Sequence, residues 1–494
     1  MRYDKGVELQ PGEEGTVKPV EGLPEGFRLY ERSVWEKGGI TFALVKGGGG
    51  KRLFASQLLS GFSGAQEVES GYLLPLTPQN ALALAEWVPE LRPRRLPKGP
   101  SFGFGDRIGL ATPGHVRALS GAKVFPVLAQ QSVRENSRTG RSFEEVLSSA
   151  IFGALEEGYS GGFAADADHL KRVEDAVEAA KFGYTLFTCD PSDRVVPVER
   201  LSEEELERRF RGLPQARGLE KEYLGRNFQI KGLGRIRFSE RELAAAAVKY
   251  SPAIELAARM YQALSEALPD GFDFELSLDE AESPTTPIEH YFVVKELQKR
   301  EVELSCLAPR FGGSMEKAVD YRGSLEVFRR DLRAHIAIAK VLGDYRISLH
   351  SGSDKFRLYP VLAGEAEGLW HVKTAGTSYL VALEVTARRA PELFRRIAEL
   401  SLERFELERA TYHLSTDVSR IPNLEALSDG ELPRLLAQED SRQVLHVTFG
   451  SVLRGELGEE LRGVLLEHEE EHYRLLAEHL GRHLEALGVK DGQG

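Results

Sequence analysis

From Ser101 onward the chain alternates short apolar runs with amphipathic helical stretches. This alternation is typical of a parallel sheet whose strands are joined by helices. Eight β/α units of this kind close into a barrel, so we predict an α/β fold, a TIM-like (β/α)8 barrel. The eight runs are Phe102–Leu110, Val124–Ala129, Gly162–Ala167, Tyr184–Thr188, Phe272–Leu278, Val302–Leu307, Tyr345–Leu349 and Trp370–Thr374.

The remaining sequence divides around this barrel. Residues 1–100 are predicted to form a small N-terminal α/β domain, which ends in the proline-rich joint RPRRLPKGP. The barrel spans residues 101–384, with an insertion at about residues 195–270 after the fourth strand. Residues 385–494 are predicted to form a helical C-terminal extension. We interpret the insertion as a lid or a subunit contact, and we expect a homo-oligomer.

The composition limits the class of protein. The 494 residues are 41% hydrophobic and carry a net charge of −12, with acids and bases interspersed, which indicates a soluble globular protein without a nucleic-acid partner. No apolar run approaches membrane-spanning length, and the first residues show no signal-peptide core, so we expect a cytoplasmic protein without a membrane partner. Cys189 and Cys306 lie within apolar runs and are predicted to be buried thiols.

Polar residues gather where the apolar runs end, which is the edge of such a barrel that carries its chemistry. The stretch GGFAADADHLKR, Gly161–Arg172, places Asp166, Asp168 and His169 at the end of one run. In a regular strand Asp166 and Asp168 share one face and His169 takes the other, but at a bent strand end all three can face one pocket. The alternative is that Asp168 caps the next helix and His169 lies on the surface.

Two histidines directly follow buried runs, and we predict that they bind one metal ion. These are His169 and His350, each flanked by acids that could orient the ring or complete the ligand set. Either one alone could instead be a hydrogen-bonded polar histidine. Glu316 and His371 are both candidates for the third ligand. The expected cofactor is a divalent cation, either zinc, manganese, nickel or cobalt.

A carboxylate inside an apolar strand is expected to have a raised proton affinity, so Glu275 is predicted to be a general acid. Asp168 is the opposing base. The alternative is that Glu275 pairs with Lys373 inside the barrel. Cations at the strand ends would suit an anionic substrate. The residues expected to bind substrate are Gln131, Arg134, Asp166, Arg310, Ser353, Lys355 and Lys373.

Two motifs match functional patterns only superficially. His468–His472 reads HEEEH, the zinc-peptidase spacing, but its central residues are all acidic, so a solvated helix face is the better interpretation. The stretch GGGGKR, Gly47–Arg52, lacks the spacing of a phosphate-binding loop and is predicted to be a hairpin turn.

Long strings resemble the tagaturonate epimerase family of bacterial hexuronate catabolism. They are SFGFGDRIGLATPGHVRAL, PVLAQQSVRENSRTGR, GFAADADHLKR, FTCDPSD, SLHSGSDKF, HVKTAGTSY and HVTFGSVL. The resemblance extends from Ser101 to the end of the chain and is weak before Arg92. It implies a metal-dependent interconversion of D-tagaturonate and D-fructuronate, which related enzymes extend to tagatose and fructose.

The same resemblance implies roles for individual residues. Asp168 corresponds to the proton acceptor, Glu275 to the proton donor, and His169 and His350 to metal ligands. It does not place the third ligand, for which Glu316 is our candidate.

The two sugar acids differ at a carbon two bonds from the ketone, where a simple enolate cannot invert the centre. Two mechanisms remain possible: transient oxidation by a bound nicotinamide, and retro-aldol cleavage. Gly103, Gly105 and Gly109 only approximate a dinucleotide-binding fingerprint, so we expect retro-aldol epimerisation, with a metal that polarises the ketone. A class II-type aldolase acting on a sugar acid and a non-catalytic sugar-acid-binding barrel remain as alternatives.

Overall fold

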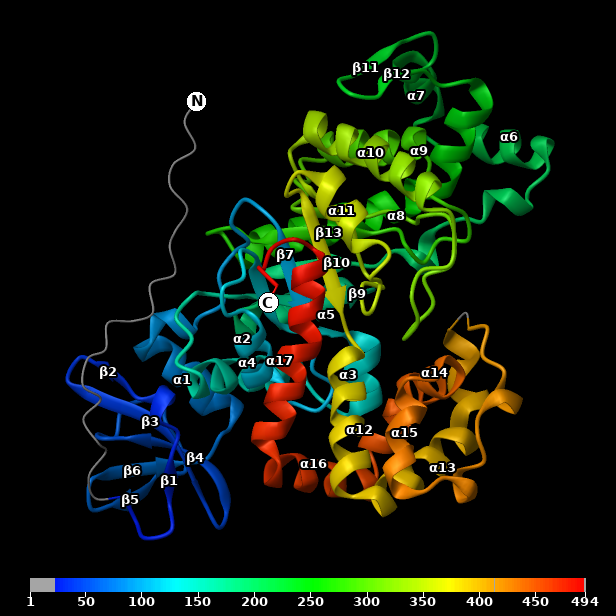
Figure 1. The fold of residues 1–494 in the computed structure, drawn as a ribbon. Coiled ribbons are helices and arrows are strands. Elements are labelled where there is room, and N and C mark those ends of the chain that lie inside the picture. The colour runs from blue at the N-terminus through cyan, green and yellow to red at the C-terminus, as the bar shows by residue number, and fades with distance from the viewer. Residues whose placement is uncertain (1–22, 413, 493–494) are drawn as a thin grey trace.

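A closed barrel of eight parallel strands lies at the centre of the molecule (Figure 1), as the alternating sequence predicts. The structure is a computed structural model that describes residues 23–412 and 414–492. The spatial strand order is β10-β13-β14-β15-β16-β7-β8-β9. The barrel strands are β7 (Ser101–Phe104), β8 (Phe125–Ser132), β9 (Ala164–Leu170), β10 (Leu186–Cys189), β13 (Asp273–Ser277), β14 (Cys306–Ala308), β15 (Arg346–Leu349) and β16 (Trp370–Thr374).

Before the barrel, an antiparallel sheet and one helix form a separate layer. The strands are β1 (Arg28–Leu29), β2 (Trp35–Lys37), β3 (Ile40–Gly47), β4 (Gly50–Ala55), β5 (Gln66–Val68) and β6 (Gly71–Leu74), and the helix is α1 (Pro78–Trp87). Gly47 pairs with Gly50, so the glycine-rich stretch is the predicted hairpin turn. Residues 1–22, which the sequence analysis included in this domain, lie outside the described residues.

Helices surround the barrel in the order expected of β/α units. They are α2 (Thr112–Ala118), α3 (Val133–Thr139), α4 (Phe143–Glu156), α5 (Val173–Phe182), α8 (Glu240–Ala267), α9 (Pro287–Gln298), α10 (Leu325–Leu342), α11 (Tyr359–Ala366) and α12 (Thr377–Arg389). Helix α8 packs between α5 and α9 and so completes the unit that follows β10. The predicted insertion therefore included a helix of the barrel itself.

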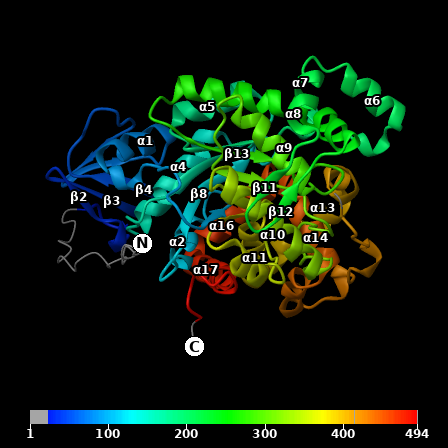
Figure 2. The ribbon, with the colours of Figure 1, turned by 90° about the horizontal axis from the view of Figure 1, so that it is seen from above.

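The inserted segment proper lies between β10 and α8. It contains α6 (Glu203–Arg211), α7 (Ala216–Tyr223) and a hairpin of β11 (Phe228–Ile230) and β12 (Gly234–Ile236). Figures 1 and 2 show it on the opposite side of the barrel from the N-terminal sheet. Helix α8 begins where Ser239 and Glu242 form a capping box, which ends the insertion.

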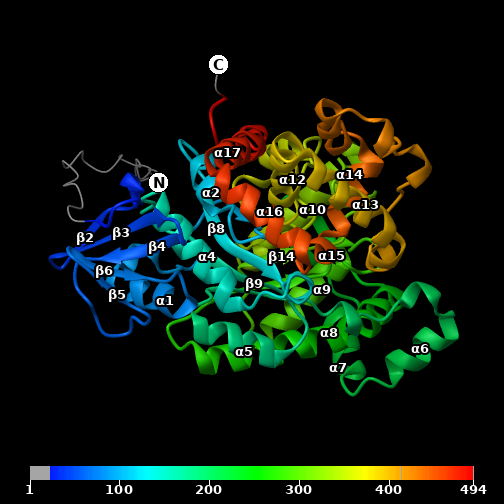
Figure 3. The same ribbon diagram turned by 90° about the horizontal axis from the view of Figure 1, so that it is seen from below.

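The C-terminal extension is helical and lies along the barrel (Figure 3). Its α-helices are α13 (Pro391–Glu408), α14 (Glu439–Val447), α15 (Phe449–Leu453), α16 (Glu456–Glu467) and α17 (Glu469–Ala486). Helix α17 packs against α2, and α15 packs against α3. Within residues 23–412 and 414–492, no helix is both long and apolar enough to cross a membrane.

The HEEEH motif lies at the start of α17, and its interpretation as a solvated helix face is wrong. Glu469 and His472 are buried. Glu469 accepts hydrogen bonds from Arg28 and Tyr30 of the N-terminal sheet, while the helix packs against α2. These two residues are buried because α17 joins the sheet to the barrel, while Glu470 stays exposed. His468 and His472 belong to none of the candidate metal groups among the described residues.

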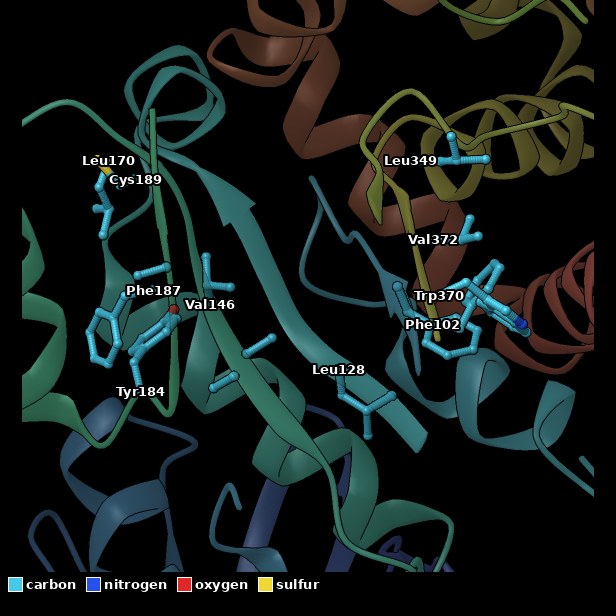
Figure 4. Packing of buried hydrophobic residues seen from close by; sticks show 14 of the residues in the cluster. Phe102, Leu128, Val146, Leu170, Tyr184, Phe187, Cys189, Leu349, Trp370 and Val372 are labelled. Carbon is cyan, nitrogen blue, oxygen red and sulfur yellow. The ribbon is translucent and has the colours of Figure 1, made fainter. Parts of the chain in front are cut away.

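Apolar side chains fill the space between the barrel strands and their helices, as Figure 4 shows for Phe102, Val372 and Trp370 on one side and Phe187 and Tyr184 on the other. The Tyr184 hydroxyl donates to the carbonyl of Phe143, which satisfies its polar end. Cys189 and Cys306 are buried free thiols, as predicted.

Strand β9 is longer than the predicted run and contains Asp166, Asp168 and His169. His169 has a φ of +52°, and the pairing of β9 with β10 is irregular between Phe187 and Cys189. This bend breaks the alternation of faces, so consecutive residues can reach one site. Strand β7 is shorter than predicted because the Asp106 carboxylate caps the loop that follows, accepting from three backbone N–H groups.

Four buried histidines make stability depend on pH: burial lowers the pKa of His115, His335, His472 and His483 from 6.5 to about 4. Between pH 6.5 and 4 the unfolded chain binds protons that the folded chain does not. The free energy of unfolding should therefore fall with decreasing pH, by up to about 1.4 kcal/mol per pH unit for each histidine. Urea unfolding across this range would measure it. His115→Gln should make the decline shallower, and an identical slope would contradict this.

Candidate active site and metal centre

The ammonium group of Lys373 lies at the centre of the barrel, among three carboxylates. Its Nζ is 2.7 Å from Asp166 Oδ2, 2.8 Å from Asp168 Oδ1 and 2.8 Å from Glu275 Oε2, and it donates to Thr188 Oγ1 at 2.7 Å. All five side chains, here called the lysine cluster, are buried. They come from β9, β10, β13 and β16, so closure of the barrel brings them together.

The lysine cluster gives its carboxyl groups different proton affinities. Burial disfavours the ionised form of Glu275, but Lys373 and His350 outweigh it and hold the pKa of Glu275 well below its usual range. Burial likewise opposes ionisation of Asp168, but His169 and Lys373 keep its pKa low. At Asp166 burial prevails, and the pKa rises to about 7.

The expectation that burial would raise the pKa of Glu275 is therefore wrong. Pairing with Lys373, the alternative from the sequence, is what the structure contains. The charge of Lys373 explains the difference, because a cation within hydrogen-bond distance favours the carboxylate form. The carboxyl group with the raised pKa is Asp166, which had been predicted to bind substrate.

His169 and His350 lie side by side above the lysine cluster, with ring centroids 4.9 Å apart. Asp279 joins them, and one ligand atom from each of the three lies within 4.8 Å of the other two. The Nδ1 atom of His350 is 3.3 Å from Asp279 Oδ1 and is buried without a hydrogen-bond partner. Two imidazoles and a carboxylate with an unpaired buried nitrogen fit a divalent cation. These three residues are called the metal group below.

Carboxylates of the lysine cluster hold the histidine rings of the metal group. Glu275 Oε1 is 2.7 Å from His350 Nε2, and Asp168 Oδ1 is 2.8 Å from His169 Nδ1. Carboxylates that orient metal-binding histidines are a recurrent feature of metal sites. The two residues predicted to exchange protons therefore also fix the predicted ligands.

The structure does not place Glu316 with the histidines. Its Oε2 accepts hydrogen bonds from the backbone N–H of Ser415 and from Gln443 Nε2, both in the C-terminal extension. It therefore holds the extension against the loop after β14. His371, the other candidate, lies deeper in the barrel, where Ser101 Oγ is 2.9 Å from its Nδ1. Asp279 takes the third place instead.

Several residues predicted to bind substrate have partners in the protein. Lys355 Nζ donates to the backbone carbonyls of Glu316, Val319 and Ser353, so it ties two loops together. Arg310 donates to the backbone carbonyl of Asp279 at 3.1 Å and so supports the loop that carries this residue. These two cations hold loops in place, and Lys373 belongs to the lysine cluster.

The other predicted residues lie around the strand ends. Gln131 is buried next to Glu135. Arg134 is 3.5 Å from Glu280, and its guanidinium lies over the Tyr412 ring. The Ser353 hydroxyl accepts weakly from the N–H of Ala375 and lines a cavity next to His350.

Sequence reasoning assigned no role to three residues near the site. Asp279 stands two residues beyond the end of β13, in a position typical of barrel active sites, but nothing local distinguishes it from Glu280. Lys317 lies in the loop after β14, and His446 lies in α14; both line the cavity next to His350. His446 opens the string HVTFGSVL, which was the available signal for its importance.

A family model described as UxaE, tagaturonate epimerase, matches residues 30–487. The chain belongs to the tagaturonate epimerase family. It is 45% identical over 469 residues to the tagaturonate/fructuronate epimerase of Thermotoga maritima, a match that covers 94% of this chain and 97% of that protein. The resemblance seen in the sequence is thus confirmed, and membership makes the protein an epimerase.

Crystal structures of a member of the tagaturonate epimerase family have the same fold. The native and the glycerol-complexed fructuronate-tagaturonate epimerase UxaE of Cohnella laeviribosi each superpose with a TM-score of 0.90 at 36% identity. Each match covers 94% of this chain and 97% of that one. The common fold therefore includes the N-terminal sheet and the helical extension as well as the barrel.

Removing the charge of Lys373 should strongly destabilise this epimerase. In Lys373→Met, three buried carboxylates would lose their cation, and breaking a buried ion pair in this way costs about 3–5 kcal/mol. Chemical denaturation would measure the loss. The control is Lys340→Met, which removes the exposed ion pair with Glu367 and should cost under about 1 kcal/mol. Equal stabilities of the two variants would contradict a central role for Lys373.

Proposed function

We propose that this protein interconverts D-tagaturonate and D-fructuronate. The proposal is supported by its family and by the similar Thermotoga and Cohnella proteins, whose names state this activity. The observation that carries it is the contact between the lysine cluster and the metal group. Groups that can move protons lie within hydrogen-bond distance of groups that can bind a cation.

We further propose that His169, His350 and Asp279 hold the divalent cation, with zinc, manganese, nickel and cobalt as candidates. When bound, such a cation supplies Lewis acidity toward the ketone of the substrate. Asp168 and Glu275 would keep both imidazoles oriented toward it. This ligand set has only three protein groups, which leaves coordination positions for substrate oxygens.

The stereochemistry of the substrates favours retro-aldol epimerisation. The two sugar acids differ at the hydroxyl-bearing carbon β to the ketone. Cleavage of the bond between the α and β carbons yields an aldehyde and an enediolate. Rotation of the aldehyde and re-addition to its other face invert the centre. The protein must take the β-hydroxyl proton on cleavage and return a proton after re-addition.

Asp168 and Glu275 are suited to these two proton transfers. Both are held ionised by Lys373, so Asp168 can accept the hydroxyl proton directly. Lys373 hydrogen-bonds Asp168 and lies 2.8 Å from Glu275, so it couples the charges of the two carboxylates. Lys373 can pass one proton to Glu275 and take one from Asp168, so the proton removed from the hydroxyl reaches Glu275. Glu275, on β13, would then return it to the new alkoxide. Asp166, with its pKa of about 7, is a neighbouring group that can keep a proton at neutral pH.

Single substitutions should show whether Asp279 or Glu316 is the third metal ligand. His350→Ala and Asp279→Ala should lose bound metal and epimerase activity together, because each removes a ligand. Glu316→Gln should keep its metal, since Glu316 bonds only to the C-terminal extension and its own loop. Elemental analysis of the purified variants would measure this. Full metal content in Asp279→Ala, or loss of metal in Glu316→Gln, would reverse the assignment.

Product analysis on D-tagaturonate tests the function itself. The wild-type protein should form D-fructuronate, and Asp168→Asn should lower turnover at least about a hundredfold, the usual contribution of a general base. The accumulation of an aldehyde fragment would instead indicate an aldolase. The absence of any conversion by the metal-loaded protein would reject the function and favour a sugar-acid-binding barrel.

A further inference from the structure

A cavity opens beside His350, and no carboxylate of the lysine cluster lines it. Its walls include Lys317, Ser351, Ser353 and Gly376 from the barrel loops and His446 from the C-terminal extension. None of the residues that line it, all within the described chain, is acidic. The lysine cluster, by contrast, contains three carboxylates in contact with Lys373, and Glu275 of this cluster lies 2.7 Å from Nε2 of His350. This cavity is called the acid-free pocket.

Lys317 brings a positive charge to the acid-free pocket, and no carboxylate of the described residues lies within ion-pair distance of it. Its Nζ donates to the Ser351 hydroxyl at 3.0 Å. Burial and the nearby charge of Arg134 lower its pKa, against the opposing effect of the carboxylates of Asp279, Glu280 and Glu135. An enclosed cation without a direct ion-pair partner is costly, and an anionic ligand at this position would reduce the cost.

His446 faces the acid-free pocket from α14. The ring is buried, and its Nδ1 has no hydrogen-bond partner in the described structure. Burial, with help from Arg107 and Lys317, holds its pKa well below the usual range, so the ring is neutral and carries one N–H donor. Arg107 donates to the backbone carbonyl of His446 at 3.0 Å and fixes this part of the helix.

Gly376 gives the His446 ring the space that it occupies. A Cβ atom at position 376 would lie 1.8 Å from Nε2 of the ring, so any other residue would displace it. The loop after β16 therefore leaves room for the ring of a residue from another part of the chain. A buried unpaired ring nitrogen calls for a partner, and a carboxylate that also contacts the cation of Lys317 would form charge-assisted hydrogen bonds here.

We propose that the acid-free pocket binds the carboxylate of the sugar acid, with Lys317 as its ionic partner and Ser351 and His446 as hydrogen-bond donors. The inference rests on the proposed function, and it predicts how the substrate is oriented in the site. The ketone end faces His169 and His350, and the carboxylate points toward the C-terminal extension. Lys317 replaces Arg310, Lys355 and Lys373 as the expected carboxylate partner. Lys355 also lines the pocket, but all three of its N–H groups donate to backbone carbonyls. Arg310 donates to the backbone carbonyl of Asp279, and Lys373 pairs with carboxylates.

A comparison of charged and neutral sugars tests this assignment. Lys317→Met should raise KM for D-tagaturonate at least about tenfold, the scale of a hydrogen bond to a charged group. The inhibition constant of D-tagatose, which lacks the carboxylate, should change much less. Gly376→Ala should shift selectivity in the same direction by displacing His446, without touching Lys317.

Control variants separate a lost contact from a general defect. Lys317→Arg keeps the charge and should restore most of the affinity for tagaturonate, while Lys340→Met, on the surface of α10, should behave as wild type. Circular dichroism and melting temperature would show that the variants fold. The assignment is overturned if Lys317→Met raises KM for tagaturonate and the inhibition constant of tagatose by the same factor. It is also overturned if KM for tagaturonate does not change. A wild-type protein that does not convert tagaturonate would reject the proposed function first, and the subsite with it.

Discussion

One ammonium group makes the barrel interior possible. Asp166, Asp168 and Glu275 are buried together, and three carboxylates so close would repel one another without the cation of Lys373. The desolvation of such a cluster is costly, and close hydrogen-bonded geometry on four strands offsets this cost. Because Lys373 comes from the last strand and its partners come from strands on the other side of the closed sheet, the cluster forms only when the barrel closes.

The metal group depends on this charge balance. Asp168 and Glu275 each contact Lys373 through one oxygen, and each also lies within 2.8 Å of a histidine of the metal group. The position of the imidazoles is thus coupled to the charge inside the barrel. His350 belongs to two environments: it contacts the carboxylate of Glu275, and it also lines the acid-free pocket with Lys317 and His446. A sugar acid, with a reactive ketone at one end and a negative charge at the other, has the matching asymmetry.

The sequence alone could predict the barrel, because alternation of apolar runs and amphipathic helices is a local signal that repeats eight times. It could also predict the meeting of His169 and His350, since both follow strands of one parallel sheet. It could not choose between Glu316 and Asp279, because that choice depends on which loop turns toward the histidines. The C-terminal extension draws Glu316 away through Ser415 and Gln443.

The same limit applies to the cations and to proton affinity. Lys355 and Arg310 donate hydrogen bonds to backbone carbonyls. Every residue has such a carbonyl, so the pattern of side chains in the sequence could not predict these partners. A raised pKa was expected at Glu275 from burial alone, but the electrostatic effect depends on the distance to Lys373, which only the closed barrel sets. Lys317 and His446 become neighbours through a contact between the barrel and a helix more than a hundred residues later.

The placement of His446 has a consequence for biosynthesis. All eight strands of the barrel leave the ribosome before α14 is translated, so a nascent barrel can close around Lys373 while one wall of its acid-free pocket is still missing. The nascent chain would thus form the lysine cluster first. The proposed carboxylate-binding pocket would be complete only when the last helices pack against the barrel.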